Sequence, residues 1–140
     1  MRTFLLLPVL FFAFIQPSKA HMTVIPGCED AKNTFALTEC RANQIGEADA
    51  KLQEYLEAAR KQVVLHELNP SVIDAEQAAW EAYRTAHCGN LYLYWVAGTI
   101  RYEMSGMCML KLTNDRTVDV WRAYLTYLDS TPPVLPDPSL

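Results

Sequence analysis

Carboxylates are the most numerous side chains here that could do acid–base chemistry, since 16 of the 140 residues are Asp or Glu. Hydrolysis of a glycosidic bond needs two carboxyl groups about 5–10 Å apart, one of them with a raised pKa. Glu47, Glu54 and Glu57 instead share a helical face with Lys and Arg residues, which is typical of a solvated surface. No Gly-x-Ser-x-Gly turn of a serine hydrolase occurs. We therefore predict no catalytic residues and no enzyme activity.

Histidines and methionines are the candidate metal ligands. His66-Glu67 is not followed by the second histidine of a zinc-protease helix. If a leader is removed after Ala20, the amine and imidazole of His21 could chelate copper. Further ligands would come from a group of five residues: His66, His87, Met104, Met107 and Met109. The simpler interpretation is that the methionines fill gaps in a core, so we predict no metal and no cofactor.

Residues 1–20 have the features of a secretory signal peptide. Arg2 supplies the positive start, Phe4 to Ile15 is apolar, and Ser18 and Ala20 place small residues at a signal-peptidase site. The apolar run is short for a membrane span, although an uncleaved anchor is the alternative. We expect an exported protein, periplasmic or extracellular, with no stable membrane span after signal removal.

The chain without this signal is acidic. It loses Arg2 and Lys19 but no acid, so 10 of the 12 cations remain against 16 acids, a net charge of −6. Such a surface disfavours nucleic acid and anionic membranes as partners, and it favours a basic protein.

The four cysteines follow the signal, at Cys28, Cys40, Cys88 and Cys108. An even number of cysteines in a small exported chain predicts two disulfides. The sequence contains no Cys-x-x-Cys motif, which argues against a thioredoxin-like redox site or a zinc ribbon. We prefer Cys28–Cys88 with Cys40–Cys108, because bonds between helices clamp a bundle and close long loops. The sequential pairing, Cys28–Cys40 with Cys88–Cys108, stays open.

Helical periodicity dominates the remaining chain. From about residue 33 to 67, apolar residues recur every three or four positions, and Leu68 to Ser71 breaks the pattern. A second helix runs to Cys88, where Gly89-Asn90 predicts a stop. Leu91 to Val96 fits a strand, a helix or a loop. A third helix starts at Gly98-Thr99, with Ser105-Gly106 and Thr113-Asn114 as weak points.

These elements predict an all-α fold, a small bundle of about three long helices cross-linked by two disulfides. The helical domain spans residues 21–130, and the short break after the first helix makes its neighbour antiparallel. Residues 131–140 are rich in proline, so we expect a disordered tail. Four polar residues are expected to lie against the apolar stripes as a structural network, with a binding site as the alternative: Asp49, Gln77, Arg84 and Arg116.

Four blocks of the sequence carry a family resemblance. They are Ala48-Asp49-Ala50-Lys51-Leu52-Gln53-Glu54-Tyr55, the run Gln77, Trp80, Tyr83, Arg84 and Cys88, then Gly98-Thr99-Ile100, and finally Cys108, Leu112, Thr113 and Arg116. In this order they resemble the LprI-like lysozyme-inhibitor family of exported bacterial proteins. Gln53 stands where that family usually has asparagine.

The resemblance implies a helical, disulfide-bonded protein of the periplasm or cell surface and, for some members, inhibition of lysozyme. We therefore predict a protein-binding protein whose partner is a basic lysozyme. The alternatives are an envelope protein of the same fold with another partner or a role in envelope integrity, and a periplasmic metal-binding module. The expected partner surface combines acids with aromatic residues: Glu47, Glu54, Glu57, Glu81, Tyr92, Tyr94 and Trp95.

Overall fold

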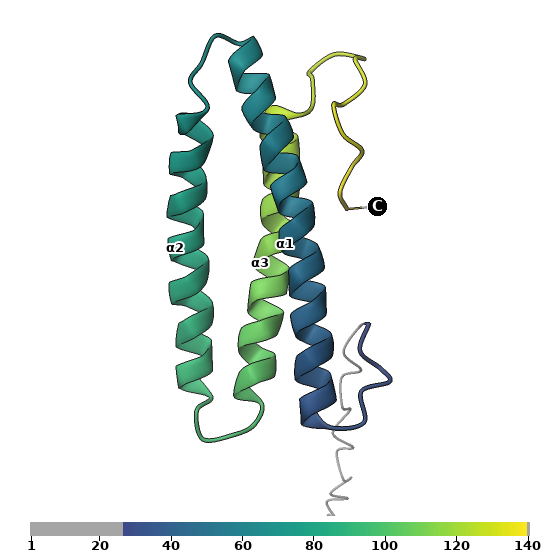
Figure 1. Ribbon diagram of the computed structural model, residues 1–140, viewed down its shortest axis with the longest axis vertical. Coiled ribbons are helices and arrows are strands. Elements are labelled where there is room, and N and C mark those ends of the chain that lie inside the picture. Colours follow the sequence, from purple (N-terminus) through teal and green to yellow (C-terminus); the bar gives the residue numbers. More distant parts are fainter. Residues whose placement is uncertain (1–26, 140) are drawn as a thin grey trace, which may run out of the picture.

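Three long helices make up the protein. A computed structural model describes residues 27–139, with α1 at Thr34–Leu65, α2 at Ser71–Tyr94 and α3 at Arg101–Tyr124. Consecutive helices run in opposite directions, and α3 packs along both others while α1 and α2 barely touch (Figure 1). The predicted all-α bundle with two disulfides is confirmed. The predicted signal peptide and His21 lie outside the described residues.

Local sequence signals explain the start and end of α1 and the start of α2. Asn33 caps α1, since its side-chain oxygen accepts a hydrogen bond from the Ala36 N–H at 2.9 Å. The chain leaves α1 through Glu67, which has a positive φ of 59°. The Asn69 side-chain oxygen then accepts a hydrogen bond, at 2.9 Å, from the N–H of Ser71, which is the first residue of α2. Pro70, between them, already has helical backbone angles.

The helices extend further than their sequences suggest. The predicted stop at Gly89-Asn90 is wrong, because α2 continues to Tyr94 and Leu91–Tyr94 is helical. Glycine inside a helix costs about 1 kcal/mol, which the packing of half-buried Leu91 and Tyr92 offsets. Helix α3 likewise passes through Thr113-Asn114 without interruption, since Thr113 is fully buried at a helix contact.

The apolar core fills the half of the bundle nearest the α1–α2 turn. Spacing by three and four places one face of α1 against α3, and the buried cluster consists of Leu52, Tyr55, Leu56, Ala59, Val63, Ile73, Val120 and Leu125. Helix α2 contributes only Ile73 to this cluster. Of the helices described here, none is both long and apolar enough to cross a bilayer.

The structure differs from the disordered tail expected for residues 131–140. Through residue 139, the chain after α3 folds back beside α1 (Figure 1), and Leu135 packs against the core. Its carbonyls accept hydrogen bonds from Trp121 to Leu135 (2.8 Å), from Tyr55 to Pro136 (2.7 Å) and from Lys51 to Pro138 (2.9 Å). Prolines prevent a helix here, but they also reduce the entropy lost when an extended strap is ordered.

The disulfides join neighbours in sequence, so the preferred pairing of Cys28 with Cys88 and Cys40 with Cys108 is wrong. Cys28–Cys40 fastens the segment before α1 to its second turn, with a Cα–Cα distance of 6.0 Å. Cys88–Cys108 links α2 to α3 at 5.6 Å. Helix α2 packs on α3 and barely touches α1, which keeps Cys88 away from the segment that carries Cys28.

Replacing Cys88 and Cys108 together by serine is expected to lower the free energy of unfolding by about 3 kcal/mol, because the bond closes a loop of 20 residues. Urea unfolding followed by circular dichroism measures the loss. The Cys28→Ser, Cys40→Ser variant opens a loop of 12 residues and should lose slightly less. A non-reducing peptide map that joins Cys28 to Cys88 would contradict the observed pairing.

Candidate functional site

The turn between α2 and α3 forms an exposed apolar end of the bundle. We call residues 92–102 the α2–α3 tip. Tyr94 is 78% exposed and Leu93 64%, and four further apolar side chains also reach solvent: Trp95, Val96, Ile100 and Tyr102. Contiguous exposed apolar side chains make the tip a candidate contact surface, and aromatic side chains contribute most to protein interfaces.

The tip is an ordered turn. The N–H groups of Trp95, Val96 and Gly98 each bond to a carbonyl three or four residues earlier, so the chain coils through the turn. The rings of Tyr94 and Trp95 meet edge to face with centroids 5.3 Å apart. Such an arrangement presents both aromatic side chains together on one exposed surface.

Arg101 connects the two sides of this turn. Its guanidinium carbon lies 5.3 Å from the Tyr92 ring centroid and 4.9 Å from that of Tyr102. Its Nη1 donates to the Val96 carbonyl at 2.9 Å, and its Nη2 donates to the Tyr102 hydroxyl at 3.2 Å. Hydrogen bonds with Tyr92 and Arg101 lower the pKa of Tyr102. Arg101 therefore holds α2, the turn and α3 in one arrangement.

The Cys88–Cys108 disulfide closes the chain segment that contains the tip. Cys88 is fully buried, six residues before the end of α2 at Tyr94. Cys108 lies seven residues after the start of α3 at Arg101, so the bond joins the two helices about two helical turns from the helix ends at the tip. A segment fixed at both ends loses little conformational entropy on binding.

Two polar clusters hold the helices together along the bundle. In the first, Arg84 of α2 donates through Nη1 to Asp49 of α1 at 2.5 Å and to Thr113 of α3 at 2.6 Å. Its guanidinium also lies over the Trp80 ring, 4.7 Å from the centroid. One arginine thus contacts side chains of all three helices.

The second cluster joins α2 to α3. Arg116 donates to Gln77 at 3.2 Å and to Glu76 at 2.7 Å, and the Tyr124 hydroxyl donates to the other Glu76 oxygen at 2.6 Å. Burial raises the pKa of Glu76, but the hydrogen bonds from Tyr124 and Arg116 outweigh it and hold this pKa below 4.5. The four polar residues singled out in the sequence therefore fall into two separate clusters.

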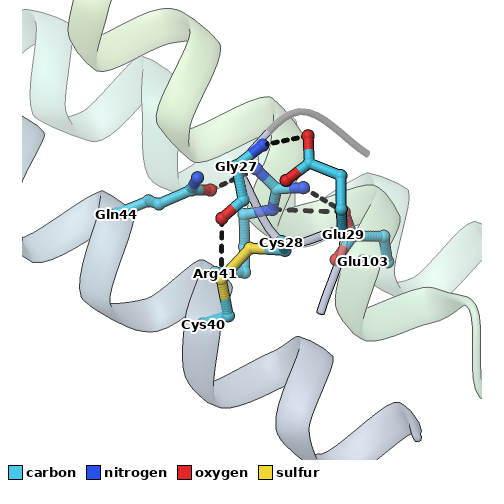
Figure 2. Close-up of a disulfide and its surroundings, with 7 residues drawn as sticks. All are labelled: Gly27, Cys28, Glu29, Cys40, Arg41, Gln44 and Glu103. Carbon is cyan, nitrogen blue, oxygen red and sulfur yellow. Dashed lines mark hydrogen bonds and ion pairs between the residues drawn. A yellow bond between two sulfur atoms is a disulfide. The ribbon is translucent and has the colours of Figure 1, made fainter. Parts of the chain in front are cut away.

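Sequence reasoning missed the most buried ion pair, between Arg41 of α1 and Glu103 of α3. Figure 2 shows the Arg41 guanidinium between Gln44 and Glu103, next to the Cys28–Cys40 disulfide. Arg41 donates to one Glu103 oxygen from Nη2 at 2.6 Å and from Nε at 3.1 Å, and the two side chains are 5% and 10% exposed. A Cβ on Gly106 would lie 2.7 Å from Arg41 Cγ, so this crossing needs glycine.

A signal for Arg41 does exist in the sequence. It lies one turn before Ile45, at a position that continues the apolar stripe of α1 toward its start. A cation on such a stripe must find a partner inside the bundle. Nothing in the spacing of α3, however, distinguishes Glu103 from an exposed acid.

The acids and aromatic residues expected to form one partner surface lie apart. Glu47, Glu54 and Glu57 are exposed on α1 and Glu81 is exposed on α2, while the aromatic residues lie at the tip. Glu54 and Glu57 line a shallow surface pocket of about 380 Å³ beside the tail residues Val134 and Leu135. Tyr94 and Trp95 are exposed, and Tyr92 is half-buried beneath Arg101.

Within residues 27–139, no group of three or more His, Cys, Asp or Glu side chains is placed to hold a metal ion. His87 stacks on the Tyr83 ring with centroids 5.5 Å apart, and His66 ends α1. These positions leave the described histidines without a shared site.

The family model described as lysozyme inhibitor LprI matches residues 28–119. The chain belongs to this family. The matched range includes both disulfides, the Arg41–Glu103 pair and the tip, whereas the tail lies beyond it. Comparison with curated proteins gives no match, and comparison with solved structures gives none.

Most residues of the central family block support the bundle. Gln77 and Arg84 accept or donate the hydrogen bonds between helices, Trp80 packs beside the core, and Cys88 forms the disulfide. Tyr83 is the exception, since its ring is mainly exposed and stacks on His87.

Replacing Arg41 by methionine is expected to lower the free energy of unfolding by about 3–5 kcal/mol, because Glu103 would remain buried without its cation. Thermal and urea unfolding measure the change. The double variant Arg41→Met, Glu103→Met removes both charges and should recover much of the loss. Equal stability of the single variant and the wild type would contradict this role.

The low pKa of Glu76 predicts a stability contribution that depends on pH. A carboxyl whose pKa is lowered by folding stabilises the native state above its unfolded pKa, and this contribution disappears as pH falls through the folded pKa. The free energies of unfolding of Glu76→Gln and of the wild type should therefore differ most near neutral pH, and this difference should shrink below about pH 4.5. Urea unfolding across this range measures it, with exposed Glu47→Gln as control. A difference that grows on acidification would refute the assignment.

Proposed function

We propose that this protein is an exported, non-enzymatic inhibitor of lysozyme that binds the enzyme through the α2–α3 tip. The observation that carries the proposal is the exposed apolar tip, closed off by the Cys88–Cys108 disulfide and braced by Arg101. The family match supports lysozyme as the partner.

The tip has the composition of a binding hot spot. Tyr94 and Trp95 offer large aromatic surfaces, and burial of such residues at the centre of an interface contributes most of the binding free energy. Their contact with each other and the ordered turn reduce the entropy that docking would remove.

Charge favours encounter with a basic enzyme. The full chain has a net charge of −4, and exposed acids lie on all three helices, for example Glu47 on α1, Glu81 on α2 and Asp115 on α3. Many lysozymes are strongly basic, so long-range attraction would raise the association rate and weaken with salt. In this proposal the acids steer the encounter and the aromatic tip forms the contact.

Export agrees with the chemistry of the cysteines. All four are oxidised, and disulfides persist in the periplasm or outside the cell. The signal-like residues 1–20 would direct the chain there, which is also where a lysozyme reaches the cell wall.

Changing Tyr94 and Trp95 together to serine should weaken inhibition at least about 10-fold, because both aromatic anchors are lost. Lysis of bacterial cell walls by several lysozymes measures inhibition, and calorimetry measures binding. Both residues are exposed, so the melting temperature should change little.

The matched control is Leu65→Ser, which removes a 73% exposed apolar residue from the opposite end of the bundle. It should inhibit as the wild type does. Loss of inhibition in this control alone would place the contact surface at the other end. A wild-type protein that slows no lysozyme at micromolar excess would refute the proposed function.

A further inference from the structure

Arg101 is an isolated cation in an apolar surface. Between the two cysteines of the second disulfide, residues 89–107 contain two charged residues, Arg101 and Glu103. Glu103 is buried and paired with Arg41, so Arg101 carries the one charge of this segment that reaches solvent. This cation at the tip is opposite in sign to the net charge of the protein.

The position of the Arg101 guanidinium is fixed before any partner binds. Tyr92 and Tyr102 lie against it, and the Val96 carbonyl accepts one of its hydrogen bonds. A guanidinium has five N–H groups, two of them on each terminal nitrogen. The contacts use one on Nη1 and one on Nη2, so three N–H groups remain: one on each terminal nitrogen and the Nε–H, which is buried without a partner. The remaining N–H groups on the terminal nitrogens can donate to a carboxylate.

Lysozymes carry the complementary group. Their mechanism uses two carboxyl groups close together in the cleft that binds the polysaccharide. We infer that Arg101 enters this cleft and pairs with the catalytic carboxylates, so that the tip occupies the substrate site itself. This inference rests on the proposed function and assigns it a competitive mode.

The surrounding residues suit such a pair. Tyr94, Trp95 and Val96 would form an apolar rim that excludes water, and a charged hydrogen bond strengthens when water is excluded. Because the tyrosines already orient the guanidinium, little side-chain entropy would be lost on pairing.

The test is a double-mutant cycle with full-length mature protein. Arg101→Gln is measured against native lysozyme and against a lysozyme whose two catalytic carboxylates are changed to amides. Binding of Arg101→Gln to native lysozyme should be on the order of 30-fold weaker or more than that of the wild type, and the loss should shrink to a few-fold with the amide enzyme. A chito-oligosaccharide that fills the cleft should compete with the wild-type inhibitor.

Arg122→Gln is the matched control, an exposed arginine on α3 at the opposite end of the bundle. It should bind both enzymes as the wild type does. If the Arg101→Gln substitution weakens binding equally to both lysozymes, Arg101 only shapes the turn and the inference is overturned. Absence of competition by the oligosaccharide would overturn it too, while inhibition itself stands. Failure of the wild type to bind any lysozyme would instead remove the proposed function.

Discussion

Arginines that cross between helices set how this bundle packs. Arg41 of α1 reaches Glu103 on α3, Arg84 of α2 reaches Asp49 and Thr113, and Arg116 of α3 reaches back to α2. The apolar core fills only the half nearest the α1–α2 turn, so the other half depends on the Arg41 and Arg84 contacts and on the disulfides. A buried charge without its partner is costly, which penalises any shift of one helix along another.

This division of the bundle also separates its tasks. The half with the apolar core supports the fold and is strapped by the tail, whereas the other half ends in the α2–α3 tip. There Cys88–Cys108 and Arg101 keep exposed aromatic side chains in place without burying them. The proposed contact with lysozyme rests on this combination of exposed aromatic side chains and an ordered turn.

Much of the fold was predictable because it depends on short-range patterns. The stripe that contains Leu52 and Val63 predicts α1, and the caps around Asn69 and Pro70 are local. Tertiary contacts overrode local signals elsewhere. Packing carried α2 past Gly89, and side-chain donors on α1 and α3 ordered a tail that proline composition alone made look disordered.

By itself the sequence determined the helical class, the family, the number of disulfides and the aromatic character of the segment around Trp95. Those properties follow from periodicity, residue counts and motifs, which need no knowledge of distant neighbours. Only the tertiary structure decided the cysteine pairing, the partner of Arg41 and the exposure of the tip. Each depends on α3 lying against both α1 and α2, and contacts between residues far apart in the chain leave no periodic trace in it.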